Sequence, residues 1–219
     1  ADTVTWMTVA AGDDLRLTSA QATGQTIGAV TDATAVITVT GLAADANLAN
    51  VGNATATVNA TVTGTIDVTA NSNLGNVDKF TVSNTKTLTA LASQVTGKTV
   101  DGAGSLIVEA LAADSNLTNV NPDGGVTALV EADRDVTANG NLGNVDTYTV
   151  SSTKTLTATA DQIDGKTVNG DGSLTVNGTA TGTTNLSNLS ADTVDITAAD
   201  LTADTVTWMT VAAGDDLRL

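Results

Sequence analysis

The residues with the clearest chemical potential are carboxylates that stand beside glycine. Asp13 and Asp14 form an adjacent acidic pair, and Asp171 stands between two glycines. Hard carboxylate oxygens at such turns are ligands that calcium prefers, and a formal net charge of −16 would favour a divalent cation. Two neighbouring carboxylates could also serve acid and base roles if burial separated their pKa values. We take Asp13, Asp14 and Asp171 as candidate calcium ligands.

Solvated turns are the alternative for these carboxylates. Ala103 occupies the position of Asp171 in the preceding internal copy, so a site there would lose its carboxylate from one copy to the next. The chain has no His and no Cys, which removes the commonest general base and the commonest transition-metal ligand. We expect a protein that is not an enzyme and that has no cofactor beyond calcium at these positions.

Composition narrows the class of partner and the class of fold. Only 8 basic residues stand against 24 acidic ones, so phosphate would be repelled and a nucleic-acid partner is not expected. No apolar run approaches the length of a membrane-spanning helix. Hydrophobic residues make up 41% and charged residues 15%, and Val, Ile and Thr alternate along the chain, which is typical of β-strands rather than of disorder.

The elements that would position these carboxylates are marked by a recurring box, Asn-Leu-x-Asn followed by Val or Leu. The box stands at residues 47–51, 73–77, 116–120, 141–145 and 185–189. We expect its Leu and its final Val or Leu to face a core. Its Asn side chains would bond turn backbone or form interrupted ladders between neighbouring coils.

Nested repeats surround these boxes. Residues 1–17 recur unchanged as residues 203–219, so the largest period is 202 residues and residues 203–219 begin the next repeat. Residues 71–108 match residues 139–176 at 27 of 38 positions. With a more divergent first copy, this predicts copies at about 1–70, 71–138 and 139–202. One ninth of 202 residues is about 22, close to one coil of a three-faced β-helix.

We therefore predict an all-β fold, a parallel β-solenoid with three coils per copy, as one continuous segment over residues 1–219. The handedness of parallel crossovers favours a right-handed β-helix, and nine coils would rise about 43 Å at a strand spacing of about 4.8 Å. One turn of helix is expected at most, at residues 43–45 and 112–114. Alternation predicts that the following apolar residues face the core: Val77, Phe80, Val82, Leu88, Val95, Val100, Leu106, Val108, Leu117, Val120, Val145, Tyr148, Val150, Leu156, Ile163, Val168, Leu174, Val176, Leu186 and Leu189.

Residues 155–158, 162–168 and 170–176 carry a resemblance. Their Thr-, Ala- and Gly-rich strand pattern resembles the tandem β-strand repeats of giant secreted or surface-displayed bacterial adhesin-like proteins, many of which are expected to be β-solenoids. The resemblance implies a place outside the cell or on the bacterial surface and a structural role. Residues 170–174 also resemble the calcium-binding repeats of RTX β-rolls, without their regular nine-residue spacing.

Together these observations predict a structural repeat of an extracellular filament, stalk or surface layer, whose partner is a further copy stacked head-to-tail. The alternative is a β-helical protein that binds or degrades glycans. Such a protein would gather acidic and basic or aromatic side chains in one groove, whereas this chain repeats its unusual residues evenly.

Overall fold

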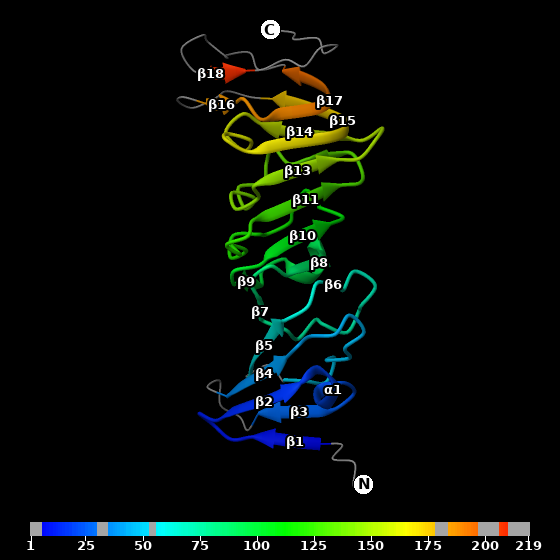
Figure 1. Ribbon diagram of the computed structural model, residues 1–219, viewed down its shortest axis with the longest axis vertical. Helices are drawn as coiled ribbons and strands as arrows, with labels where there is room; N and C mark the ends of the chain where they lie inside the picture. The colour runs from blue at the N-terminus through cyan, green and yellow to red at the C-terminus, as the bar shows by residue number, and fades with distance from the viewer. Residues whose placement is uncertain (1–5, 30–34, 53–55, 178–183, 197–205, 210–219) are drawn as a thin grey trace. The chain divides into compact units, whose positions relative to one another are not determined.

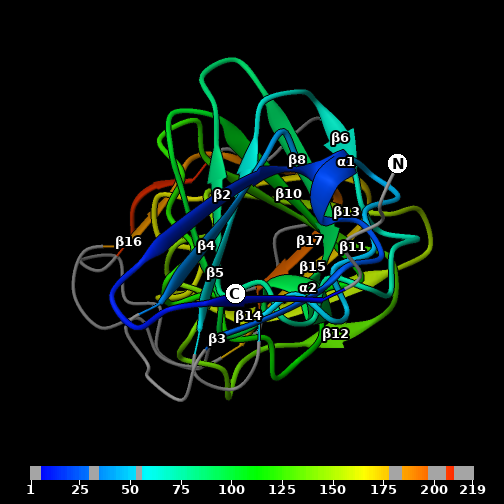
Figure 2. The same cartoon turned by 90° about the horizontal axis from the view of Figure 1, so that it is seen from below.

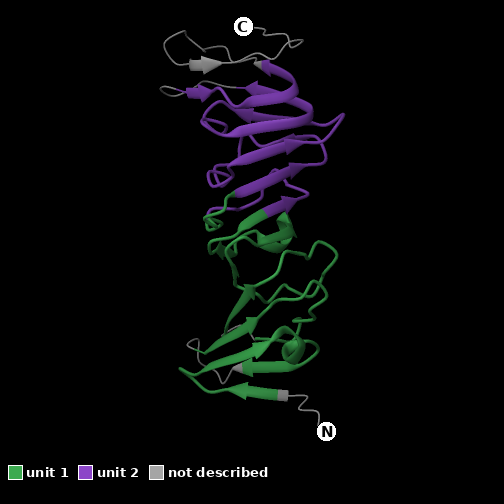
Figure 3. Cartoon of the chain, viewed as in Figure 1, with its two compact units in different colours: residues 1–106, 119–125 green, residues 107–118, 126–219 purple. Residues whose placement is uncertain are grey.

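The structure is a computed structural model that describes residues 6–29, 35–52, 56–177, 184–196 and 206–209 (Figure 1). The predicted fold class is confirmed: the chain is mostly strands with few helices, its sheets are parallel, and its stacked coils form a β-solenoid of about 9 turns. The handedness of the solenoid stays a prediction. The chain divides into two compact units, residues 1–106 with 119–125 and residues 107–118 with 126–219 (Figure 3).

Unit 1 contains a five-stranded parallel sheet in the order β2-β4-β5-β7-β9, together with the pairs β1-β3 and β6-β8. Strands β2, β4 and β5 overlie one another in the view of Figure 2. Successive partners such as Leu15 and Ile37 are one coil apart along the chain. The elements of this unit are β1 (Trp6–Val9), β2 (Asp14–Thr18), α1 (Ser19–Ala22), β3 (Thr26–Ala29), β4 (Val36–Thr40), β5 (Thr57–Val62), β6 (Ile66–Asp67), β7 (Lys79–Val82), β8 (Thr87–Leu91), α2 (Ala92–Val95) and β9 (Thr99–Asp101).

Unit 2 repeats the arrangement with its own parallel pairs. Strand β13 pairs with β11 and β15, β14 pairs with β12 and β15, β15 pairs with β17, and β16 pairs with β18. Its elements are β11 (Val126–Val130), β12 (Arg134–Asp135), β13 (Thr147–Val150), β14 (Thr155–Thr159), β15 (Thr167–Asn177), β16 (Thr184–Leu186), β17 (Leu189–Ile196) and β18 (Val206–Met209). The boundary between the units falls within β10 (Ser105–Glu109).

The core follows from strict alternation along these short strands. In β4 the side chains of Ile37 and Val39 are buried and those of Thr38 and Thr40 are partly exposed. Every apolar side chain that the sequence predicts to face the core is buried. Phe80 and Tyr148 are among the largest of the fully buried side chains and occupy equivalent positions in consecutive copies.

Glycine marks the places where one coil crosses closely over another. Gly102 and Gly170 have φ angles of +100° and +106°, a region that favours glycine. A Cβ atom at Gly170 would lie 2.2 Å from the carbonyl oxygen of Val150, and one at Gly102 would lie 2.3 Å from that of Val82. No side chain fits there, so the repeated glycines keep the coils in contact.

The helices lie elsewhere than predicted. Residues 43–45 and 112–114 form turns, each closed by one backbone bond such as that from the Ala46 N–H to the Ala43 carbonyl. The described helices are α1 and α2, of four residues each. At the start of α1 the side-chain oxygen of Gln21 accepts from the Thr18 N–H and closes the first turn, although Gln162 accepts equivalently from the Thr159 N–H where the chain forms only a turn. The turn at 43–45 has no such glutamine. Among the described residues no helix is long and apolar enough to cross a membrane.

Candidate functional site

The candidate calcium ligands are surface residues in separate units. Asp14 begins β2 in unit 1 and Asp13 directly precedes it, Asp171 lies in β15 in unit 2, and all three are exposed. The backbone of Asp13 has a structural role, because its N–H donates to the Ala10 carbonyl and its carbonyl accepts from the Val36 N–H. Across the described part of the chain, no three His, Cys, Asp or Glu residues form a group that could hold a metal ion. Calcium binding stays a prediction.

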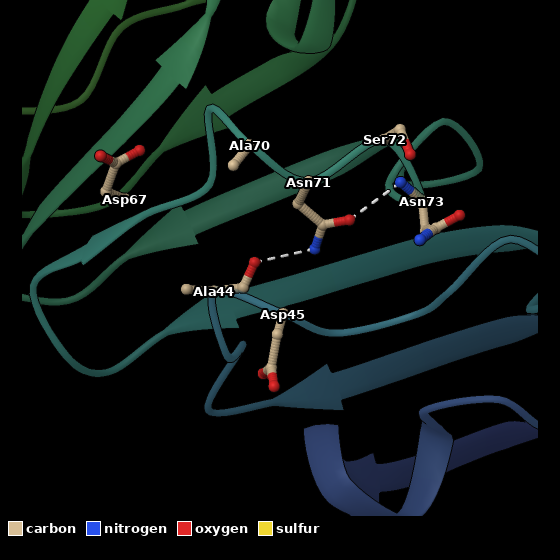
Figure 4. Close-up of a pocket in the computed structure, with 7 residues that line it drawn as sticks. All are labelled: Ala44, Asp45, Asp67, Ala70, Asn71, Ser72 and Asn73. Atoms are coloured by element: carbon tan, nitrogen blue, oxygen red, sulfur yellow. Dashed lines mark hydrogen bonds between the residues drawn. The ribbon is translucent and has the colours of Figure 1, made fainter.

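The most elaborate polar cluster is built around Asn71, between β6 and β7. Asn71 is only 8% exposed. Its side-chain Nδ2 donates to the Ala44 carbonyl of the preceding coil at 2.9 Å, and its Oδ1 accepts from the Asn73 N–H at 2.8 Å (Figure 4). The same Nδ2 also donates to the Ala46 carbonyl at 2.9 Å. Because each amide group has its partners, the burial of this side chain leaves no orphaned polar atom.

Gln94 of helix α2 continues the cluster from the following coil. Its Nε2 donates to the carbonyls of Val68 and Asn71 at 2.7 and 2.6 Å. Its Oε1 accepts from the Leu91 N–H at 2.7 Å, which closes the first turn of α2. Asn71 and Gln94, which we call the amide corner, therefore join three successive coils through side-chain hydrogen bonds.

Unit 2 contains the same amide corner. Asn139 donates to the Ser115 carbonyl at 2.9 Å and accepts from the Asn141 N–H at 2.9 Å. Gln162 donates to the carbonyls of Val136 and Asn139. The two corners thus share most of their bonding pattern, apart from the second carbonyl that Asn71 reaches, which indicates that they belong to the repeat and not to a single binding site.

A surface pocket of about 390 Å³ lies beside the amide corner of unit 1. The residues that line it, shown in Figure 4, are Ala44, Asp45, Asp67, Ala70, Asn71, Ser72 and Asn73. It offers two carboxylates and side-chain amides, so it could accept hydrogen bonds from hydroxyl groups or interact with a cation. Its lining includes the hydroxyl of Ser72 and no thiol, imidazole or amine.

Asp67 in this pocket is held in its ionised form. Its Oδ1 accepts from the Thr69 hydroxyl at 2.7 Å and from the Thr69 N–H at 2.8 Å. These bonds, first of all the one from the hydroxyl, hold the pKa of Asp67 below its ordinary value. Asp135 in unit 2 has the same shift through Thr137. A glycosidase general acid needs a raised pKa, so Asp67 is unsuited to that role.

The Asn-Leu-x-Asn boxes occupy corners, as predicted. Leu48 and Val51 of the first box are buried. Asn76 of the second box donates to the carbonyls of Ala49 and Val51 at 2.8 and 3.1 Å, so this box lies against the first. In unit 2, Asn144 donates to the Thr118 carbonyl at 2.8 Å and stacks the fourth box on the third. The asparagine ladders are interrupted in the next coil, where the Nζ of Lys98, and not an Asn side chain, donates to the Gly75 carbonyl.

The amide corner itself was missed from the sequence, although a signal for it exists. Gln21, Gln94 and Gln162 occupy equivalent positions in the three copies, and Asn71 recurs as Asn139. A polar side chain that returns with the apolar pattern indicates a bond between coils. Its partners are backbone carbonyls, which carry no sequence signature.

Comparisons with protein-family models, with curated proteins and with solved structures find no match to the chain. The class of protein that the geometry defines is a parallel β-solenoid with repeated polar corners.

Proposed function

We propose that the chain is a structural repeat of an extracellular bacterial filament, stalk or surface-layer protein that lengthens by stacking coil on coil. The observation that carries the proposal is the identity of residues 1–17 and 203–219 in a chain folded as stacked parallel coils. In such a fold each coil bonds to the next one, so a sequence that starts again after 202 residues provides for a further set of coils.

The polar groups support a mechanical role. The amide corners join successive coils of each unit, and their side-chain N–H groups donate to backbone carbonyls. The box asparagines do the same. Side chains that are already hydrogen-bonded within the repeat contribute stiffness and have little capacity left for a ligand.

The surface chemistry is consistent with a solvated exterior. The chain carries a formal net charge of −16, and outward-facing Thr residues such as Thr38 and Thr40 alternate with buried apolar ones. Charge of one sign keeps long polymers dispersed. The placement outside the cell rests on the resemblance to surface-displayed bacterial repeats.

Electron microscopy of a two-repeat chain, residues 1–202 joined directly to residues 1–219, tests the proposal. We expect an uninterrupted solenoid whose pattern returns after about 43 Å, the rise of nine coils at about 4.8 Å each. A control chain with a flexible Gly/Ser linker of about 20 residues between the repeats, and with Trp6→Pro and Thr8→Pro in the second repeat to prevent β1 from pairing, should separate into two particles. Two particles without the linker would contradict the proposal.

A further inference from the structure

The segment Trp-Met at positions 6–7 and 208–209 lies in two different strand pairs. In β1 it pairs in parallel with β3, Trp6 opposite Thr26 and Met7 opposite Ile27. In β18 the identical residues pair in parallel with β16, Trp208 opposite Asn185 and Met209 opposite Leu186. The same sequence therefore pairs with a strand that follows it in the chain at residues 6–9, and with a strand that precedes it in the chain at residues 206–209.

Each of these strands uses only one of its two edges within the described residues. Strand β1 belongs to a two-stranded sheet with β3, and β18 belongs to a two-stranded sheet with β16. A parallel strand inside a solenoid uses both edges. If the two identical segments are superposed, each gains a partner strand at its unused edge. The resulting strand order is β16, then β1 or β18, then β3.

We infer that the edge of β16 is the docking site for β1 of a second copy of this chain, with Asn185 opposite Trp6 and Leu186 opposite Met7. This inference rests on the proposed function, because it describes the junction between one repeat and the next. Residues 206–209 of the chain itself occupy this site and show the register that a second copy would adopt.

Burial on both sides of the junction supports this partner. Leu186 is 0% exposed beneath β18, and Ile27 is 1% exposed between Met7 and Val51. Met7 in β1 is only partly buried. If Leu186 of one copy lay against Met7 of the next, the buried apolar side chains would form a continuous column of Leu186, Met7, Ile27 and Val51. Met7 would then be removed from water.

Charge supports the same partner. The chain carries a net charge of −16, so two copies repel each other as wholes. The strands at the junction, residues 6–9 and 184–189, contain no charged residue. Like charges opposite each other would destabilise a strand pair, and this junction has none. Salt should therefore strengthen docking, because it screens the long-range repulsion and leaves the apolar contact unchanged.

Disulfide trapping tests the register, and the absence of native Cys makes the result unambiguous. The receiving chain carries Val206→Pro and Trp208→Pro, which remove β18 from the edge, and Asn185→Cys. The donating chain carries Trp6→Cys and keeps its own β18. We expect a disulfide-linked heterodimer on mild oxidation. Thr8→Cys in place of Trp6→Cys should give almost none, because two residues of strand add about 6.6 Å and exceed disulfide reach.

An intramolecular control, Asn185→Cys with Trp208→Cys in one chain, establishes that β16 is folded and that this register allows a disulfide. If this control forms its disulfide and the two-chain mixture does not, the docking inference is overturned. Equal trapping of Trp6→Cys and Thr8→Cys would overturn the register. Failure of the proposed function looks different: the two-repeat chain would appear as two particles in electron microscopy, whatever the result of the trapping.

Discussion

Tyr148 carries a buried hydroxyl that has no hydrogen-bond partner among the residues that the structure describes. The side chain is 1% exposed, and Phe80 fills the equivalent position of the preceding copy at 0% exposed. A buried donor left unpaired costs about 1–3 kcal/mol. Tyr148→Phe removes the hydroxyl and keeps the ring, so we expect the free energy of unfolding to rise by about 1–2 kcal/mol.

Urea denaturation followed by far-UV circular dichroism measures this change, as a higher midpoint with an unchanged slope. The matched variant is Phe80→Tyr, which adds the hydroxyl at the equivalent buried position and should lower stability by about 1–3 kcal/mol. A Tyr148→Phe protein less stable than the wild type would refute the reasoning, because it would show that the hydroxyl is hydrogen-bonded.

The same burial affects alkaline pH. Removal from water raises the pKa of Tyr148 well above its ordinary value. Between about pH 10 and the raised value, the unfolded chain loses the tyrosine proton and the folded chain keeps it, so stability should fall with rising pH by about 1.4 kcal/mol per unit. Tyr148→Phe should lack this component. Since the chain has 1 Tyr, absorbance titration reports this residue alone.

Three further predictions concern the coil contacts. Gly170→Ala should destabilise the fold by about 2–4 kcal/mol, because of its φ of +106° and the close carbonyl, whereas Gly143→Ala, with nothing within 4 Å, should change chemical-denaturation midpoints little. Asn71→Ala leaves two carbonyls of the preceding coil unpaired and should cost about 1–3 kcal/mol by the same assay; an unchanged midpoint would contradict a structural part for the amide corner. Thr69→Val should raise the pKa of Asp67 toward its ordinary value in an NMR titration, with the equivalent carboxyl of unit 2 unchanged. The lowered pKa of Asp67 stabilises the fold at pH values above the ordinary pKa of an aspartate. This stabilisation is lost as the pH falls through the pKa that Asp67 has in the folded chain, so the acid dependence of stability should weaken in the variant.

Alternation was sufficient to predict the core, and the nested repeats were sufficient to predict the solenoid. Residues such as Leu106 and Val108 stand two apart, so both face the same side of a strand, and both are buried. The repeat period supplied the coil length, and partners such as Tyr148 and Val168 lie 20 residues apart in the structure, close to the predicted 22.

The rest depended on contacts between coils, which local patterns do not encode. Residues 43–45 have good helix formers but make a turn, whereas α2 forms where Gln94 reaches back to the Leu91 N–H. The same bond from Gln162 to the Thr159 N–H accompanies only a turn, so this bond alone does not decide where a helix forms. The amide corner was missed because Asn71 bonds to backbone carbonyls, which every residue type offers. The candidate calcium residues were chosen by residue type alone, and the fold places Asp13 and Asp171 in different units.

The near-constant coil length has a kinetic consequence. Paired residues are separated by similar stretches of chain, 20 residues for Ala60 and Phe80 and 22 for Leu15 and Ile37. The entropy lost in closing one coil therefore does not grow with the number of repeats, and relative contact order falls as repeats are added. An all-β protein of this kind can fold by local addition, each completed coil serving as the template for the next, so the time to add one coil should be independent of chain length.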